Sequence, residues 1–261
     1  MKWHRVVAVM VRHVYNFGHS WDKIADAFYW PAIDILLWGL TSRYMVEQGG
    51  TLPSVVVILL SGLVYWQIVW RSQYEITTNL LEELWSHNLV NLFATPLKLR
   101  EWLVSVLALG MLKMGVTLGF ASLLAWGLYA VNIYATGWWF VPLLGLLIMT
   151  GWWVGFIVSG LIIRFGTRIQ TLAWAGVYIL APFSGIFYPI SVLPEWAQTV
   201  AAVIPTSHVF EGMRAILLGG SWPMKEVGVS LGLNVVYLLL SMWWFGWLFN
   251  QRKERGLAQL E

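Results

Sequence analysis

Six long apolar stretches constrain this chain more than any other feature of its sequence. A helix needs about 20 largely apolar residues to cross the hydrocarbon core of a bilayer. Only 11% of the residues are charged, whereas soluble domains carry roughly 25%. The sequence therefore predicts an all-α membrane protein with six transmembrane helices, at about residues 28–46, 54–71, 102–131, 138–163, 169–189 and 227–249.

Lysine and arginine are distributed unevenly over the segments between these stretches. With both termini inside, the outer segments hold Arg43, Arg214 and Lys225, and the inner segments hold Lys2, Arg5, Arg12, Lys23, Arg71, Lys98, Arg100, Arg164, Arg168, Arg252, Lys253 and Arg255. Segments rich in Lys and Arg stay in the cytoplasm. We therefore expect a multi-pass protein of the cell (inner) membrane with cytoplasmic termini. The net charge of +3 is too small to suggest nucleic-acid binding.

Residues 1–26 have the pattern of an amphipathic helix. Its apolar face holds Trp3, Val7, Met10, Val14 and Phe17, and its opposite face holds Arg5, Arg12 and Asn16. Such helices lie in the membrane interface, with the apolar side in lipid and the basic side toward anionic headgroups. We expect a cytoplasmic interface helix here, ahead of a six-span domain over residues 27–261. It either anchors the first span or contacts a cytoplasmic partner.

The longest inner loop, residues 72–101, also contains a helical pattern. Asn79 followed by Glu82 has the spacing of a capping box, and Pro96 ends the leucine-rich run that follows. We expect a helix over about residues 79–93 that is either a plain connector or a coupling element docked on a motor subunit. The candidate coupling residues are Glu82, Glu83, Trp85, Ser86 and His87, together with Arg5 and Arg12.

Between the fifth and sixth apolar stretches the chain is interrupted by prolines and remains half apolar. Irregular backbone at membrane depth is tolerated only where it is buried in protein or lines a cavity. We therefore expect a re-entrant helical segment over about residues 189–214 that forms an outer gate. Its candidate residues are Ser184, Gly185, Tyr188, Pro189, Pro194, Trp196, Pro205, Glu211 and Arg214.

Two side chains of this segment can interact locally. Glu211 and Arg214 stand three residues apart, which permits an ion pair on a helix; contact with an anionic headgroup or a glycan phosphate is the alternative. His208 has no second histidine at ligand spacing, so no metal site is expected.

Asp34 and Lys113 are the ionisable residues that lie most clearly within the apolar stretches. A charge at the centre of a bilayer costs about 2.5–3.5 kcal/mol on insertion scales, so each should face protein, water or a partner. They either pair with each other, or Lys113 extends to an interface. Both are candidates for the transport pathway. The 19 tryptophans form an interfacial belt, or some line the pathway and stack on ring-bearing cargo.

The chain has no phosphate-binding loop of its own. Such a loop ends in Gly-Lys followed by Ser or Thr, and no Gly-Lys pair occurs in the sequence. Energy for transport must therefore come from a partner or from an ion gradient.

Two sequence segments resemble the ABC transmembrane type-2 permease family. The run LLEELWSHNLVNLFATPLKLR over residues 80–100 is similar to its coupling segment. The run SGIFYPISVLP, followed by Trp196, Pro205 and FEGMR at 210–214, resembles the signature before its last span. Together with six spans and internal termini, the resemblance covers nearly the whole chain.

The resemblance implies the permease subunit of an ATP-binding cassette exporter. Two such permeases, identical or related, would form the membrane half, surrounded by membrane lipids. Two cytoplasmic ATPase subunits would bind ATP and Mg, so that this chain binds no cofactor and is not itself an enzyme. They would dock on the N-terminal helix and the 79–93 helix. Cargo in the family includes polysaccharides, glycolipids, lipids and small amphipathic drugs.

Two other classes of protein fit the sequence less well. Rhomboid-type proteases use Gly-x-Ser-Gly with a histidine in a later span, and neither Ser159 nor Ser184 has a glycine two residues before it. An ion-coupled secondary transporter usually has inverted repeats and several intramembrane carboxylates. This chain has no convincing internal repeat, and Asp34 alone lies well inside a span.

Overall fold

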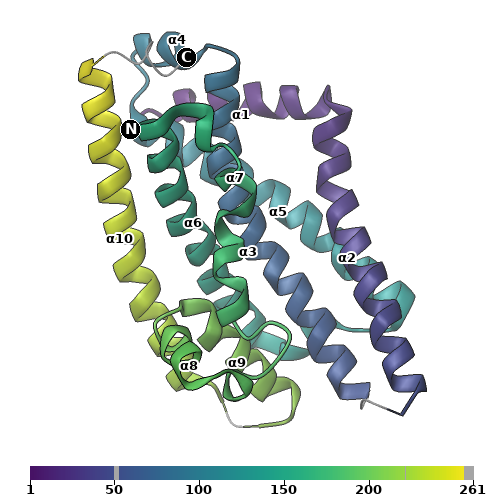
Figure 1. Cartoon of the computed structure of the whole chain (residues 1–261). Helices are drawn as coiled ribbons and strands as arrows, with labels where there is room; N and C mark the ends of the chain where they lie inside the picture. The colour runs from purple at the N-terminus through teal and green to yellow at the C-terminus, as the bar shows by residue number, and fades with distance from the viewer. Residues whose placement is uncertain (50–52, 221, 256–261) are drawn as a thin grey trace.

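The computed structural model describes residues 1–49, 53–220 and 222–255, and every regular element within these ranges is helical (Figure 1). The long helices are α2 (Trp21–Glu47), α3 (Pro53–Trp85), α5 (Leu99–Tyr129), α6 (Phe140–Phe165) and α10 (Met224–Arg255). The shorter elements are α1 (Trp3–Gly18), α4 (Leu89–Ala94), η1 (Ile133–Trp139), η2 (Gly166–Ile169), α7 (Leu172–Ala175), η3 (Gly176–Ile179), η4 (Ala181–Phe183), η5 (Ile190–Val192), α8 (Glu195–Ala202) and α9 (Pro205–Leu217). The predicted all-α membrane fold is confirmed. The predicted domain over 27–261 extends beyond the described residues at its C-terminal end.

Within the described ranges, helices long and apolar enough to cross a membrane are Ser54–Trp85, Leu99–Tyr129, Ile133–Ile169 and Met224–Lys253, four in all. They contain four of the six predicted spans. The first predicted span lies on α2, which has 27 residues but carries charged side chains such as Asp34 along its length. The fifth, predicted over residues 169–189, is only partly covered by a shorter apolar helical stretch, Leu172–Phe183.

The stretch Leu172–Phe183, called the fifth segment below, is not one continuous α-helix. It divides into α7 and two 3-10 turns, η3 and η4. Gly176 lowers helix stability at the first division because glycine loses the most backbone entropy on folding. Pro182 lacks the N–H that would continue the hydrogen-bond ladder. Breaks of this kind leave backbone carbonyls that other groups must satisfy.

Helix α3 stands at the centre of the molecule and packs against α2, α5 and α6. Its closest approach is to α6, where a Cβ added at Gly151 would lie 2.4 Å from the Cβ of Ser72. Because real side chains do not approach so closely, only glycine permits this contact. A second glycine, Gly155, faces Ile76 in the same way, and α3 and α6 therefore form one tightly packed pair.

Short elements cover the two ends of the bundle (Figure 1). Helix α1 lies across the upper end in this view, where α4 and the end of α10 also lie, whereas α8 and α9 lie at the lower end. We call the end with α1 and α4 the inner end and the end with α8 and α9 the outer end. The start of the chain and the last described turn of α10 thus share one end of the molecule.

The expected separate helix over residues 79–93 is replaced by a different arrangement. Helix α3 continues without a break to Trp85, and Asn79 donates to the carbonyl of Glu75 at 2.6 Å instead of capping a new helix. The spacing of Ile76, Leu80 and Leu84 explains the continuation, because all three are buried on one side of α3. The chain turns after Trp85, and α4 contains only the last part of the predicted helix.

Candidate functional site

The inner end of α3 is joined to α1 and α2 by ion pairs. Glu83 pairs with Arg12 of α1, and Glu82 pairs with Lys23 of α2 at 2.7 Å. Glu83 is only 3% exposed, so its carboxylate belongs to the interior. A cavity of about 650 Å³ lies among these charges, lined by Arg12, His13, Asn16, Lys23, Glu82, Glu83, Trp85, Ser86 and Asn88.

His13 is held neutral beside these charges. Its side chain is buried, and its ring nitrogen lies 3.8 Å from a carboxylate oxygen of Glu83. Burial, followed by the nearby cations Arg12, Lys113 and Lys23, lowers the pKa of His13 to about 3. At neutral pH the imidazole therefore carries no charge.

The basic face of α1 packs against protein, which corrects the expectation that it meets lipid headgroups. Arg5 pairs with Glu101 of α5 at 3.4 Å and donates to the carbonyl of Pro96. The backbone N–H of Lys2 donates to the same carboxylate at 2.7 Å. On the opposite face Trp3 remains 66% exposed, which fits a lipid-facing stripe. Arg5 and Arg12 thus attach α1 to the body of the molecule.

Trp85, Ser86 and His87 occupy the exposed turn at the end of α3. The indole N–H of Trp85 donates to the side chain of Gln170 at 3.1 Å, and its ring stacks on Trp174 at a centroid distance of 6.3 Å. Ser86 bonds back to the carbonyl of Glu82, and His87 has a positive φ of 51° in the turn. Trp85 therefore connects the end of α3 to the beginning of the fifth segment.

Polar side chains of α3 satisfy carbonyls that the broken fifth segment leaves free. Gln73 and Thr77 donate to the carbonyl of Ala173 at 3.0 and 3.3 Å. The indole N–H of Trp70 donates to the carbonyl of Trp174 at 3.4 Å. The position of the fifth segment is therefore tied to α3 through its own irregular backbone.

Four charged side chains form a compact cluster between α2, α3 and α5. Arg71 bonds to Asp26 at 3.0 Å and to Glu75 at 3.1 Å, and Lys113 bonds to Glu75 at 2.8 Å. Two cations and two anions make this cluster neutral. Sequence reasoning identified Lys113 but missed its partner Glu75, although the spacing of Arg71 and Glu75, four residues apart on a helix, was an available signal.

Asp34 is not the partner of Lys113, which answers the question left open by the sequence. Its carboxylate accepts a hydrogen bond from the side-chain amide of Gln67 on α3 at 2.6 Å. The two predicted pathway residues therefore belong to different surroundings.

At the outer end, Arg214 joins α9 to the loop after the fifth segment. It donates to the carbonyl of Gly185 at 2.6 Å and pairs with Glu211 at 2.8 Å, which confirms the local ion pair expected from their spacing. Glu211 also accepts from the backbone N–H of Ile190 at 2.8 Å. Gly185 has a φ of +69°, which favours glycine.

The other predicted outer residues surround this joint. Ser184 shares a hydrogen bond of 2.6 Å with Thr206, and Tyr188 donates to the carbonyl of Pro182 at 2.7 Å. Pro189, Pro194 and Pro205 immediately precede or begin η5, α8 and α9, where a missing N–H costs little. Trp196 is 65% exposed and makes an edge contact with Phe183. Sequence reasoning missed Thr206 and the pairing of His208 with Glu226.

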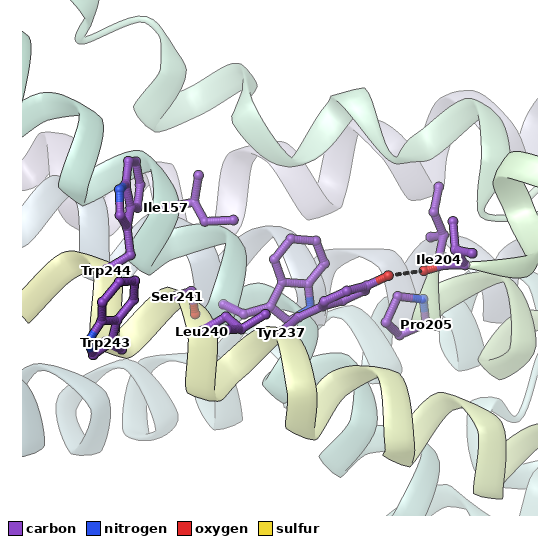
Figure 2. A pocket seen from close by; sticks show the side chains of 10 residues that line it. Ile157, Ile204, Pro205, Tyr237, Leu240, Ser241, Trp243 and Trp244 are labelled. Atoms are coloured by element: carbon purple, nitrogen blue, oxygen red, sulfur yellow. Dashed lines mark hydrogen bonds between the residues drawn. The ribbon is translucent and has the colours of Figure 1, made fainter.

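A separate apolar groove of about 600 Å³ lies between α6, α10 and the start of α9. Figure 2 shows Trp243 and Trp244 at one end and Ile204 and Pro205 at the other. The hydroxyl of Tyr237 donates to the carbonyl of Val203 at 2.9 Å, so this polar group is satisfied internally. No Asp, Glu, Lys, Arg or His lines the groove, so it differs in character from the charged sites.

No group of three His, Cys, Asp or Glu side chains suited to a metal ion occurs in the described part of the chain.

Comparison with known proteins gives one family. The family described as ABC-2 type transporter matches the sequence over residues 19–218, which is more than half of the chain. No curated protein matches it.

Proposed function

The chain belongs to the ABC-2 type transporter family, and on this premise we propose that it is the permease subunit of an ATP-driven exporter. As a transport subunit it would move cargo, and a separate ATPase subunit would bind ATP and Mg and hydrolyse the nucleotide. The cargo classes that fit such a permease are a lipid, a glycolipid or polysaccharide, or an amphipathic small molecule.

The proposed topology has six spans. Helix α2 and the fifth segment supply the two spans beyond the four long apolar helices. The common location of α1 and the end of α10 (Figure 1) supports an even number of spans. The excess of Lys and Arg in the inner segments supports cytoplasmic termini in the cell (inner) membrane.

One observation carries the mechanism that we propose: Trp85 bonds to Gln170 and stacks on Trp174. These contacts join the exposed turn at the inner end to the start of the fifth segment. The same segment is followed directly by Ser184 and Gly185, which are bound to Thr206 and Arg214. A displacement of the turn can therefore reach the outer end through one stretch of chain.

We propose that two ATPase subunits dock on this turn and on α4, beneath a pair of permeases that is homomeric or made with a related subunit. Trp85, Ser86 and Asn91 are exposed there. Glu83, in contrast, is buried and pairs with Arg12 of α1. ATP binding would bring the ATPase subunits together and move the turn. The segment over residues 189–214, acting as a re-entrant outer gate, would then open toward the outside.

Reconstitution tests this function. The permease is placed in sealed vesicles with or without its ATPase subunit, and cargo movement and ATP hydrolysis are measured together. We expect vanadate-sensitive hydrolysis and export only when both subunits are present. Transport driven by an ion gradient without an ATPase subunit would instead establish a secondary transporter.

A matched pair of variants tests the docking surface. Asn91→Arg places a bulky charge on the exposed face of α4, and Thr199→Arg makes the same change on the exposed face of α8 at the outer end. We expect Asn91→Arg to reduce permease-dependent ATPase activity about tenfold, because a bulky charge at a packed contact leaves neighbouring groups unpaired. Thr199→Arg should leave it unchanged. Equal activity of the two variants would remove α4 from the docking surface.

A further inference from the structure

The charged side chains within the membrane-spanning helices differ in whether they are paired with an opposite charge. Arg71, Glu75, Lys113 and Asp26 neutralise one another in a single cluster. Asp34 makes no ion pair with any described residue, and its carboxylate accepts a hydrogen bond from the amide of Gln67. An amide reduces the cost of burying a carboxylate but supplies no opposite charge. Among the carboxylates of these helices whose side chains the structure describes, Asp34 is therefore the one without a basic partner.

Aromatic side chains occur on the face of α2 that carries Asp34 and on the fifth segment. Trp30 and Trp38 lie four residues before and after it, which places them on the same face of α2. Tyr178 of the fifth segment makes an edge contact with Trp66 of α3 at a centroid distance of 6.1 Å, and Trp66 directly precedes Gln67. Trp30 is 50% exposed and Tyr178 is 49% exposed, so their faces remain available to a ligand. Asp34 itself is partly exposed.

A carboxylate near accessible aromatic rings favours a cationic ligand. Aromatic faces attract cations, and an intramembrane carboxylate favours a positive group beside it. The described cations that lie over aromatic rings are Arg71 over Tyr74, Lys113 over Phe17 and Arg164 over Phe165. None of them is over Trp30, Trp38 or Tyr178, so no cation in the described part of the chain occupies these rings.

We propose that Asp34 is the counter-ion for a cationic, amphipathic cargo that binds between α2, α3 and the fifth segment. This inference rests on the proposed export function and names its cargo class. The positive group of the cargo lies against Asp34 and the exposed rings of Trp30 and Tyr178, and Gln67 holds the carboxylate in place. Anionic lipids and phosphorylated glycans are disfavoured, because their charge has the same sign as Asp34.

Two probes of nearly the same shape and opposite charge test the proposal: tetraphenylphosphonium and tetraphenylborate. The permease and its ATPase subunit are reconstituted in sealed vesicles, and the stimulation of ATP hydrolysis and the ATP-driven movement of each probe are measured. Direct binding of each probe to the detergent-purified permease is measured in parallel. We expect the cation to bind, to stimulate hydrolysis and to be moved, and the anion to do none of these.

The variants are Asp34→Asn, Asp34→Glu and Glu47→Gln. Asn keeps the size of the side chain and a hydrogen bond to Gln67 but removes the charge, so we expect affinity for the cation to fall about tenfold or more. Glu restores the charge and should recover most of the affinity. Glu47 is an exposed carboxylate of the same helix, paired with Arg43, and its substitution should change nothing. Gel filtration and thermal unfolding confirm that each variant is folded.

The outcomes separate this inference from the function on which it rests. Equal binding of the two probes, or unchanged cation binding in Asp34→Asn, overturns the cargo assignment even if ATP-driven transport is intact. Absence of ATPase-dependent transport with charge-selective binding retained overturns the export function and leaves Asp34 as a cation site.

Discussion

At the inner end of the molecule, side chains of opposite charge connect separate regular helices, whereas at the outer end side chains donate mainly to backbone carbonyls. Arg12 reaches Glu83 and Lys23 reaches Glu82 at the inner end. At the outer end Arg214, Ser207 and Ser230 donate to the carbonyls of Gly185, Ala201 and Pro205. The difference follows from the backbone, because regular helices satisfy their own carbonyls and broken ones do not.

The two kinds of joint should respond differently when one side chain is lost. Removing one partner of a buried ion pair leaves a charge without compensation, which destabilises the whole fold. Removing a donor to a loop carbonyl leaves a neutral group that water can reach after a local opening. We therefore expect global unfolding from changes at the inner end and in the charge cluster below it, and local opening from changes at the outer end.

The largest expected effect is that of Glu75→Gln in the charge cluster. Glu75 is 2% exposed and binds both Arg71 and Lys113, so its loss leaves two cations with one remaining anion. Breaking a buried pair costs about 3–5 kcal/mol, and we expect a correspondingly lower midpoint of thermal unfolding in detergent. Glu47→Gln on the exposed surface should not shift the midpoint.

The double variant Glu75→Gln with Lys113→Gln distinguishes charge imbalance from loss of packing. It leaves Arg71 with Asp26, one cation with one anion, at a distance of 3.0 Å. We expect it to be more stable than Glu75→Gln alone. A double variant that is less stable than the single one would show that the cluster contributes through its hydrogen bonds more than through its charge balance.

Arg214→Met should have the next largest effect. Arg214 is 7% exposed and is bound to Glu211 and to the carbonyl of Gly185. The methionine fills part of the volume but removes the donor to the carbonyl of Gly185 and the cation beside Glu211, which keeps only the N–H of Ile190, at a cost of about 2–4 kcal/mol. In hydrogen exchange we expect faster exchange over residues 185–192 and unchanged exchange in α3. Uniformly faster exchange in both regions would contradict the distinction between the two ends.

The ion pair between Glu211 and Arg214 was predictable because it depends on spacing along one helix. The spans on α5, α6 and α10 were predictable because a long apolar run in a bilayer must satisfy its own backbone hydrogen bonds, which it does as a helix. The cluster around Glu75 was not, because it brings together helices far apart in the sequence. The break in the fifth segment was missed because the segment is as apolar as a span, although Gly176 and Pro182 were available signals.

The extension of α3 to Trp85 shows why a local motif can mislead. Asn79 and Glu82 have the residue types of a capping box, but the apolar periodicity of Ile76, Leu80 and Leu84 continues through them. Burial of that face outweighs a cap that contributes only about 1 kcal/mol. The predicted coupling residues nevertheless lie close together, because the extended helix brings Glu82, Glu83 and Trp85 to the same end.

His13 gives the inner end a dependence on pH. Its pKa is about 3 in the folded protein and 6.5 in its unperturbed state, so the unfolded chain binds the additional proton at pH values between them. Stability is therefore greatest above pH 6.5 and decreases by about 1.4 kcal/mol per pH unit as the pH falls toward 3. At pH 5 we expect a loss of about 2 kcal/mol by this route.

Chemical unfolding of the purified protein between pH 7.5 and 5 measures this effect. His13→Gln should show a shallower decrease than the unsubstituted protein, whereas His19→Gln, at an exposed position after α1, should not change the slope. The same slope in His13→Gln and the unsubstituted protein would mean that another group governs acid sensitivity.

The smallest expected effect comes from two adjacent threonines of α3, and it tests whether the fifth segment needs its tie to the helix. Thr77 donates to the carbonyl of Ala173 in that segment, whereas the hydroxyl of Thr78 bonds only within its own helix, to Tyr74. Both side chains are buried, so Thr77→Val and Thr78→Val make the same chemical change in similar surroundings.

We expect Thr77→Val to lose about 1 kcal/mol of stability and to lower the amount of cargo moved per ATP, while Thr78→Val keeps that ratio. Thr77→Ser retains the hydroxyl and should restore coupling. If Thr77→Val and Thr78→Val reduce the ratio equally, the fifth segment does not depend on the Thr77 hydroxyl, and its connection to α3 must run through Gln73, Trp70 and Trp85.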